Sequence, residues 1–340
     1  MSTTQANQRS SPRAEDRDVL IAAGDVLASD ADSVFNEDQS STASITSSIL
    51  DYRRIHGRTY HSDKFTTNYL YPNDEQQLES GRLNHHYLTI LFEDQLFLAP
   101  LENDKIHRVL DIGTGSGIWA IELADQFPNA SVIGTDLSPC QPQWVPPNVQ
   151  FEVDDATLQW TWNANHFDFI HLRYILGGIQ DWTGLLKEAY KCCAPGGWVE
   201  SVECDIEFRS DDGTTELEPV LFSWGELFRE AGKILNRPFF VQEQQRQAFD
   251  EAGFVEKRTV LHKIPIGPWA KDRRLAEIGR FTGAALETDL QGYTQMIWHD
   301  VLQRSADEYH VWLASLRKAI RNPNVHSYMT VHAVYGRKPE

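Results

Sequence analysis

Short apolar runs with helical or turn segments between them recur along the middle of the chain. The runs occupy residues 108–112, 131–136, 149–155, 167–172 and 197–203, and several of them end in acidic residues. The clearest helical segment between them is 118–127. Strands that alternate with helices favour a mostly parallel sheet with both faces covered. In such a sheet a ligand binds at the carboxyl ends of the strands, which is where these acids lie.

Helical patterns flank this central part on both sides. Residues 75–92 have apolar positions at helical spacing after a turn and possible cap at 72–74, and such a helix can cover a ligand site as a lid. Helical insertions are expected at about 211–250 and 269–321, with a sixth strand at 253–260 and a last strand at 325–337. Their aromatic residues favour core packing, and the alternative is an apolar pocket that includes Trp269 and the run Trp298, His299 and Asp300.

The first 48 residues differ in composition from the rest. They are rich in Ser, Thr, Asp and Gln and have few residues that can be buried, which predicts a disordered, acidic, Ser-rich tail. A short helical pattern at 20–28 leaves open a protein partner that binds through this tail. Aromatic residues become frequent from residue 49, so we expect the folded domain to span 49–340.

A glycine loop follows the first predicted strand, with glycines at positions 113, 115 and 117. Glycine is needed where the backbone bends sharply or comes close to a ligand, so this loop predicts a nucleotide-containing cofactor. Asp136 ends the second strand, where a carboxylate can accept from both ribose hydroxyls, and Asp155 or its neighbour Asp154 can accept from a purine amine. The loop also fits a dinucleotide pattern, but Asp111 would repel a pyrophosphate and would orient an ammonium group.

These features together resemble the class I methyltransferases that use S-adenosylmethionine (SAM), and more narrowly the fungal LaeA-like methyltransferases of secondary metabolism. The likeness lies in residues 57–61, 71–74, 82–85, 110–119, 134–139, 167–173, 181–182 and 195–200. It implies a Rossmann-like sheet whose last strand is antiparallel and lies at the edge, an N-terminal helical lid and a SAM-binding core at about 105–205. One departure is Gly177-Gly178, where relatives often have Gly-Ser.

The resemblance also implies which residues bind SAM. They are Asp111, Gly113, Thr114, Gly115, Gly117, Asp136, Leu137, Asp155, Ala156 and Arg173. Asp111 and the glycines would surround methionine and ribose, and Arg173 would lie beside the methionine end. Arg173 could instead be a structural residue that pairs with a buried acid. His171, which lies inside the fourth strand, is either a functional residue or a histidine of the core.

Methyl transfer needs an acceptor atom held in line with the methyl group and, for a hydroxyl or amine, the removal of a proton. The sequence singles out no base, and the candidates are Tyr60, His61, His86, Tyr174 and Glu203. Three functions remain open. They are methylation of a small secondary metabolite at oxygen, nitrogen or carbon, a LaeA-like regulatory role in a nuclear complex, and a rearrangement or cyclisation in a methyltransferase-like pocket.

Charge and composition exclude several other classes of protein. The net charge of −18 argues against nucleic-acid binding, which needs clustered Lys and Arg. The four cysteines lack metal-ligand spacing, and adjacent His85 and His86 on a helix would point in different directions, so no metal site is expected. We find neither a signal peptide nor a membrane span and expect a cytoplasmic or nuclear protein that binds an apolar or aromatic small molecule.

Overall fold

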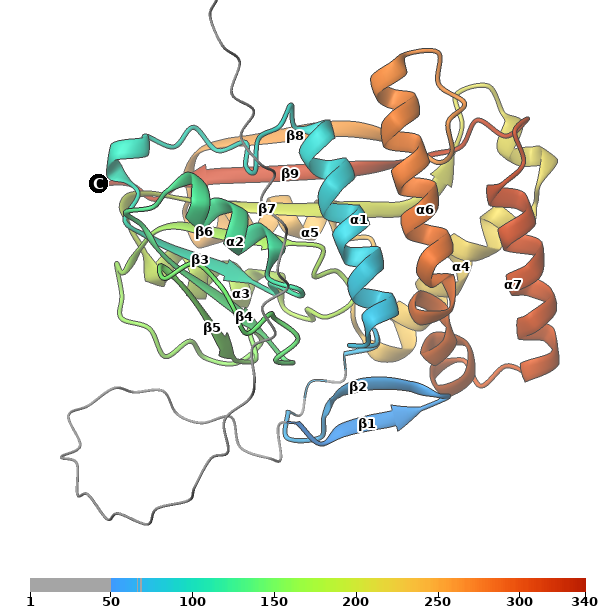
Figure 1. The fold of residues 1–340 in the computed structure, drawn as a ribbon, viewed down its shortest axis with the longest axis horizontal. Coiled ribbons are helices and arrows are strands. Elements are labelled where there is room, and N and C mark those ends of the chain that lie inside the picture. Colours follow the sequence, from blue (N-terminus) through green and yellow to red (C-terminus); the bar gives the residue numbers. More distant parts are fainter. Residues whose placement is uncertain (1–49, 66, 68) are drawn as a thin grey trace, which may run out of the picture. The chain divides into compact units, whose positions relative to one another are not determined.

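A seven-stranded sheet forms the centre of the computed structural model, which describes residues 50–65, 67 and 69–340 (Figure 1). Its strand order is β5-β4-β3-β6-β7-β9-β8. The parallel half consists of β3 (Arg108–Ile112), β4 (Ser131–Asp136), β5 (Val149–Val153) and β6 (Phe167–Arg173). The chain winds outward from β3 to β5 and then returns to β6 on the other side of β3. This reversal creates a crevice at the carboxyl ends of β3 and β6.

The second half of the sheet contains β7 (Cys193–Arg209), β8 (Val255–Pro265) and β9 (Tyr328–Arg337). β7 is parallel to β6, and β9 is antiparallel to both β7 and β8. The last strand is therefore antiparallel, as the sequence analysis expects, but the expectation that it lies at the edge is wrong. Nearly all of β9 is buried, whereas the first half of β8 is exposed and includes Glu256, Lys257 and Arg258, which suits an edge strand.

β7 extends well beyond the strand beside it. Arg173 at the end of β6 pairs with Val202, and β7 then continues to Arg209 while it remains paired with β9. Residues 203–209 of β7, 328–332 of β9 and 261–265 of β8 therefore project past the carboxyl ends of the parallel strands. We call this part of the sheet the ledge.

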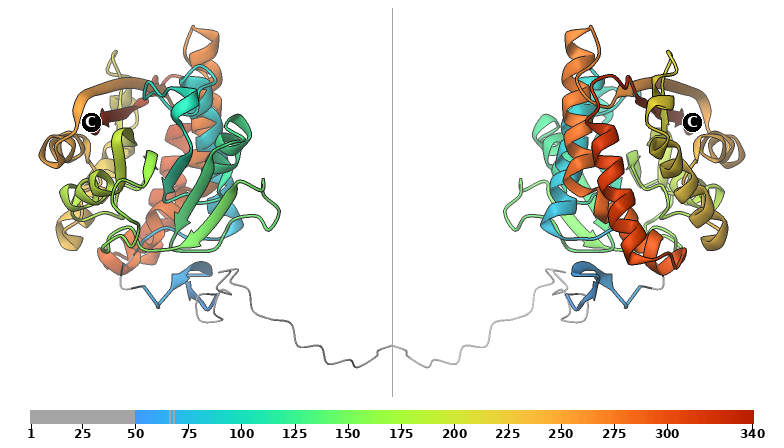
Figure 2. Two further views of the ribbon diagram at one scale, coloured as in Figure 1. Left: turned by 90° about the vertical axis from the view of Figure 1, so that its left-hand side faces the viewer. Right: turned by 90° about the vertical axis from the view of Figure 1, so that its right-hand side faces the viewer.

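Helices cover both sides of the sheet (Figure 2). α2 (Ile118–Gln126) packs in one cluster with Val109, Val132 and Phe169. α3 (Trp182–Cys192) and α5 (Gln242–Ala252) belong to the opposite cluster, with Leu110 and Ile170. Because successive strand residues point to opposite faces, this alternation confirms a sheet buried on both sides and with it the α/β fold class.

The remaining helices are α1 (Glu75–Leu91), α4 (Val220–Leu235), α6 (Arg273–Met296), the π-helix η3 (Ile297–Val301) and α7 (Ala306–Ile320). α1 packs along α6, and the two lie side by side in Figure 1. The short 3₁₀ turns η1 (Asn103–Lys105) and η2 (Thr214–Leu217) complete the helical elements. Across the described residues every helix is too short or too polar to span a membrane. The tail predicted at 1–48 lies outside the described residues.

A hairpin that the sequence analysis does not predict precedes α1. It consists of β1 (Tyr52–Ile55) and β2 (Arg58–Ser62). Arg58 donates to Asp74, the N-cap of α1, at 2.5 and 2.6 Å and to Asp289 of α6 at 2.7 and 2.9 Å. Asp289 is fully buried at a kink in α6 where the backbone is not helical (φ −141°, ψ 41°). These three residues, which we call the Arg58 clasp, join the hairpin to both helices.

Candidate cofactor and acceptor site

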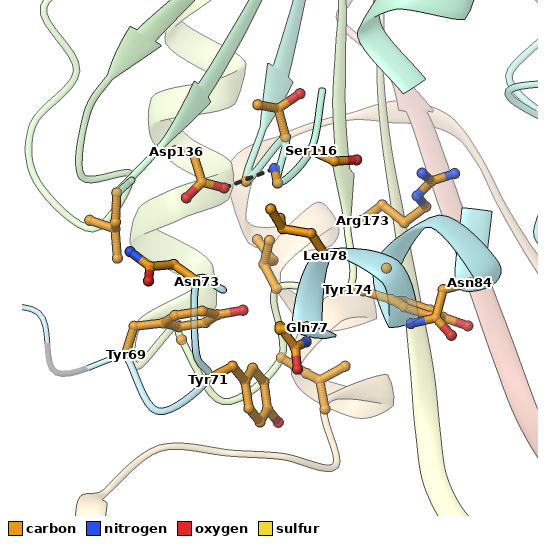
Figure 3. A pocket seen from close by; sticks show the side chains of 18 of the residues that line it. Tyr69, Tyr71, Asn73, Gln77, Leu78, Asn84, Ser116, Asp136, Arg173 and Tyr174 are labelled. Carbon is orange, nitrogen blue, oxygen red and sulfur yellow. Dashed lines mark hydrogen bonds between the residues drawn. The ribbon is translucent and has the colours of Figure 1, made fainter. Parts of the chain in front are cut away.

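A cavity of about 300 Å³ lies at the carboxyl ends of β3, β4 and β6, with α1 along one side (Figure 3). This volume is at the lower end of the range of about 300–1,000 Å³ that is usual for ligand pockets. All residues expected to bind the cofactor line this cavity except Gly117. The crevice at the reversal of strand order is therefore the candidate site.

The glycine loop connects β3 to α2 along the cavity wall. Gly115 has a φ of +56°, and no atom lies within 4 Å of the position that a Cβ would take there. Its N–H donates to Asp136 Oδ2 at 2.8 Å. Gly117, the N-cap of α2, also has a positive φ, but a Cβ there would lie 2.3 Å from the ring of Phe151. Packing therefore requires glycine at position 117, whereas Gly115 exposes its backbone to the cavity.

Asp111 is held rigidly at the end of β3. Its Oδ1 accepts from His171 Nδ1 at 2.8 Å and its Oδ2 accepts from the Thr114 hydroxyl at 2.6 Å. Burial lowers the pKa of His171, and because a carboxylate only accepts, the imidazole is neutral with its proton on Nδ1. The ring stacks on Trp119 at 3.7 Å and 5°. His171 is thus a core histidine, as considered from the sequence, and it orients Asp111.

Asp136 is half-buried at the end of β4 and faces the cavity. It accepts from the backbone N–H groups of Gly115 and Ser138, at 2.8 and 3.1 Å. Burial raises its pKa to about 6 despite these bonds. Asn73 lies on the same side of the cavity in Figure 3, and its buried Oδ1 has no hydrogen-bond partner among the described residues. Two acceptors are therefore available here to a ligand that presents hydroxyl groups.

The two acids after β5 have different surroundings. Asp155 is buried, and its carboxylate accepts from the hydroxyl of Thr67 and from the N–H and hydroxyl of Thr157, at 3.0 and 2.6 Å. Asp154 lines the same cavity and accepts from the Asp155 N–H at 2.8 Å. The carboxylate of Asp155 is already bonded by two threonines, so Asp154 has the larger remaining capacity to accept from a ligand.

Arg173 is the only Lys or Arg among the described residues that line the cavity. Its Nη2 lies 3.0 Å from His85 Nδ1, and the His85 Nε2 lies 2.9 Å from Glu122 Oε2. The alternative interpretation gave Arg173 a buried acid as its direct partner, but the guanidinium bonds to a histidine. From the sequence, His85 enters only as a metal-ligand candidate, and its contact with Arg173 is not predicted. Among the described residues no group of three His, Cys, Asp or Glu side chains could hold a metal ion.

The other half of the cavity is apolar and aromatic. The ledge, α1, α4 and α6 contribute to it with Tyr87, Cys204, Ile206, Trp224, Phe228, Ile264, Leu286, Tyr293 and Met329. None of these residues carries a charge, whereas the charged lining residues lie near the ends of β3 to β6. We call this uncharged part the acceptor half. The C-terminal insertions contribute to it through α4 and α6, so the alternative of an apolar pocket beside these insertions has a counterpart in the structure.

Comparison with known proteins identifies the family. Residues 83–256 match the family model described as "Methyltransferase domain". The chain is 33% identical to the methyltransferase pytC of Aspergillus terreus over 91% of this chain and 95% of that protein. It is 31% identical to the secondary metabolism regulator LAE1 of Cochliobolus heterostrophus (84% and 94%) and 32% identical to the probable methyltransferase tdiE of Emericella nidulans (78% and 84%).

The chain is a class I SAM-dependent methyltransferase. Within this class it belongs with the fungal LaeA-like proteins of secondary metabolism, as its motifs indicate. SAM is therefore the cofactor of this methyltransferase, and the cavity residues fit it. One cation, several acids and an open glycine loop suit a molecule with one carboxylate, an ammonium, a sulfonium and a ribose.

The methyltransferase has two of the five base candidates at its cavity. Tyr174 lines the cavity, has a φ of +55° and shares a hydrogen bond of 2.8 Å with the Tyr87 hydroxyl, and burial raises its pKa well above the usual value. His61 also lines the cavity, but its Nδ1 donates to the Ser62 carbonyl and its Nε2 accepts from Arg53 at 2.8 Å. Tyr174 therefore stays protonated at neutral pH, and both ring nitrogens of His61 already have partners, so neither is available to remove a proton.

The other three base candidates lie outside the cavity lining. Tyr60 is fully buried in the core, and His86 is exposed with its ring 4.2 Å from that of Phe281. Glu203 is buried on the ledge and accepts from the N–H groups of Ile175 and Leu176 at 3.2 and 3.1 Å, and burial raises its pKa to about 8. It supports the loop after β6 in this methyltransferase and does not line the cavity.

The pocket candidates among the tryptophans are wrong. The Trp269 indole donates to the Ser327 carbonyl at 2.9 Å, and Trp298 packs against Tyr309 and Trp312 in the core. Asp300 pairs with His56 of the hairpin, and His299 lies beside the same ring. None of these four candidates lines the cavity of the methyltransferase. The favoured interpretation of the tryptophans, core packing, is confirmed for Trp298.

Proposed function

We propose that this methyltransferase transfers the methyl group of SAM to an uncharged, apolar or aromatic small molecule bound in the acceptor half. The observation that supports this is the division of the cavity. The charged lining side chains gather at the ends of β3 to β6, and the adjoining wall from the ledge, α4 and α6 has no charged side chain among the described residues. Burying a charged substrate against that wall would be costly, because no ion partner lines it.

The cofactor contacts we propose follow from the free bonding capacity of each residue. Asp136 accepts from the ribose hydroxyls, Asp154 in place of Asp155 accepts from the adenine amine, and Arg173 donates to the methionine carboxylate. Leu137 and Ala156 border the adenine, and Asp111 with the loop of Gly113, Thr114 and Gly115 borders the methionine and ribose, as the family resemblance implies.

When bound, SAM supplies an electrophilic methyl group on a positive sulfonium. The chain's own contribution is to position the acceptor and exclude water, since the described residues that line the cavity include no side chain that can act as a strong base. The lining histidines have their lone pairs bonded, and burial raises the pKa of the lining tyrosines Tyr69, Tyr71, Tyr87, Tyr174 and Tyr293. We therefore propose an acceptor that ionises readily by itself, such as a phenol or an enolised carbonyl compound.

Purified protein incubated with methyl-labelled SAM and a panel of phenols and enols tests this proposal. We expect label in at least one acceptor together with stoichiometric S-adenosylhomocysteine. A matched panel in which each acidic hydroxyl is already methylated should remain unlabelled. Binding of SAM without label in any acceptor, including those of a fungal metabolite extract, would contradict the proposed activity.

A regulatory role is the second candidate. LAE1, which is 31% identical, is a secondary metabolism regulator, and the side chain of Trp144 is 93% exposed in the loop after β4, where it could contact a protein. SAM binding without turnover, together with a defined protein partner, would favour this role and a nuclear location over the cytoplasmic one we propose. Product without S-adenosylhomocysteine would instead favour a rearrangement or cyclisation.

We predict that the affinity for S-adenosylhomocysteine falls below pH 6. Burial raises the pKa of Asp136 to about 6, and ribose hydroxyls donate best to the ionised carboxylate. Binding therefore favours the ionised form and is weakened as the pH falls through 6, so the dissociation constant at pH 5 should be about tenfold that at pH 7. Calorimetric titration at both values measures it. Asp136→Asn should bind about tenfold more weakly at pH 7 and lose most of this pH dependence. An unchanged affinity of that variant would exclude the ribose contact.

A further inference from the structure

Three side chains from three elements form a continuous chain behind the cavity. Glu122 of α2 lies 2.9 Å from His85 Nε2, and His85 Nδ1 lies 3.0 Å from the Nη2 of Arg173 at the end of β6. His85 is 4% exposed on α1, and the Glu122 side chain is 44% exposed. The order along this chain is therefore solvent-facing acid, buried imidazole and cavity-facing guanidinium.

The chemistry of the partners determines where the imidazole proton lies. A guanidinium can only donate, so His85 Nδ1 must accept, and a carboxylate can only accept, so Nε2 must carry the proton. This arrangement needs a neutral imidazole. Burial, followed by the charge of Arg173, lowers the pKa of His85 to about 4. His85 therefore remains neutral at physiological pH and available as an acceptor for Arg173.

A guanidinium on a long side chain needs such an anchor in order to recognise a ligand well. Free arginine side chains lose roughly 2 kcal/mol of rotamer entropy when they are fixed, and a preformed geometry removes that cost from binding. Arg173 is the only Lys or Arg among the described lining residues, and its bond to His85 uses one of five N–H groups. The others remain available for an anion in the cavity.

We propose that His85 is a positioning residue, which holds the guanidinium of Arg173 in place for the carboxylate of the bound cofactor while Glu122 fixes the imidazole tautomer. This inference rests on the proposed contact between Arg173 and that carboxylate. It also couples the cofactor to α1, because the residue that holds Arg173 belongs to the helix along the cavity.

Two ligands that differ only in the amino-acid part distinguish positioning from general structural support. S-adenosylhomocysteine has the carboxylate, and 5′-methylthioadenosine has the same adenosine and sulfur without it. Arg173→Met and His85→Ala should each lower the affinity for S-adenosylhomocysteine about tenfold or more, which is the effect of losing one charge-assisted hydrogen bond. The affinity for 5′-methylthioadenosine should change less than about twofold. Calorimetry on the full chain measures all of these affinities.

The matched control is His86→Ala, on the same helix but exposed and outside the cavity lining, which should leave both affinities unchanged. His85→Asn, whose amide oxygen can replace Nδ1 as the acceptor, should restore most of the loss. The double variant of His85→Ala and Arg173→Met should bind S-adenosylhomocysteine as tightly as Arg173→Met alone, because both substitutions remove the same contact with the carboxylate. If His85→Ala destabilises the fold, Glu122→Gln tests the same chain from its exposed end and should show a smaller loss for the same ligand.

The positioning role would be overturned if His85→Ala lowered the affinities for both ligands equally. It would also be overturned if the affinity losses of the two substitutions added in the double variant. Wild-type protein that binds neither ligand would instead contradict the proposed cofactor site. Normal binding that depends on Arg173 but not on His85 would leave that site intact and remove only the inference about His85. The three results are therefore separable in one set of titrations.

Discussion

Replacing Arg58 by methionine should lower the free energy of unfolding by about 3–5 kcal/mol, the usual effect of leaving a buried charge without its partner. Asp289 is fully buried in the α6 kink, and Arg58 donates to both of its oxygens at 2.7 and 2.9 Å. Bonds from Gln76 and the Gly292 N–H would remain but are neutral. Urea titration followed by circular dichroism measures the loss.

The matched control for this prediction is Arg82→Met. Arg82 also binds two acids, Glu75 and Glu79, but on the surface, so its removal should lower the free energy of unfolding by less than about 1 kcal/mol.

Adding Asp289→Asn to Arg58→Met should recover part of the stability, because it removes the uncompensated charge. Burial raises the pKa of Asp289 even beside Arg58. Ionised Asp289 therefore lowers the free energy of unfolding at every pH above about 4, the pKa of this carboxyl in the unfolded chain. The stability difference between Arg58→Met and the wild type should become smaller as the pH falls towards this value. A deficit equal to that of Arg82→Met would show that the clasp adds no stability.

The second large effect is expected at Gly115. An alanine there should weaken SAM binding about a hundredfold while the protein still folds. No atom of the described residues lies within 4 Å of the added Cβ, so the described fold does not oppose it sterically. The methyl group would project from the wall that is expected to contact the cofactor. The φ of +56° adds about 1 kcal/mol of backbone strain.

Gly213→Ala separates the strain from the blocked contact. Gly213 has a φ of +75°, has no atom within 4 Å of its Cβ position and does not line the cavity. Its alanine variant should show a similar small loss of thermal stability with unchanged calorimetric affinity for SAM. If Gly115→Ala retains wild-type affinity, the loop does not approach the cofactor as proposed.

Local sequence patterns predicted the parts of the molecule that local physics determines. The strands of the parallel half have apolar residues and end near acids, and their positions are reproduced closely from residue 108 to 173. The glycine loop was also predictable, since few residues other than glycine adopt the positive φ found at 113, 115 and 117. The acids that face the cavity followed from the rule that ligands bind at strand ends.

Contacts between distant segments were not predictable. The hairpin is stabilised partly by the pairing of Arg58 with Asp289, which lies 231 residues further along the chain. Which of Asp154 and Asp155 can still accept a hydrogen bond from a ligand depends partly on Thr67, a residue of the segment before α1 that donates to Asp155. The sequence offered His85 only as a disfavoured metal ligand, whereas in the structure Arg173 and Glu122 lie on either side of it. The motifs at 57–61, 71–74 and 82–85, which contain His61, Asn73 and His85, were the local signals for these lining residues.

The position of β9 has a consequence for synthesis on the ribosome. In the sheet, β8 pairs only with β9. The part of β7 beyond Val202 no longer pairs with β6, so its hydrogen-bonded neighbour is β9. A nascent chain released up to residue 327 therefore displays the unpaired edge of β7 and an unattached β8, both open to association with other chains. The sheet is completed from its interior by residues 328–337, so truncation just before them should yield aggregation and not a smaller enzyme.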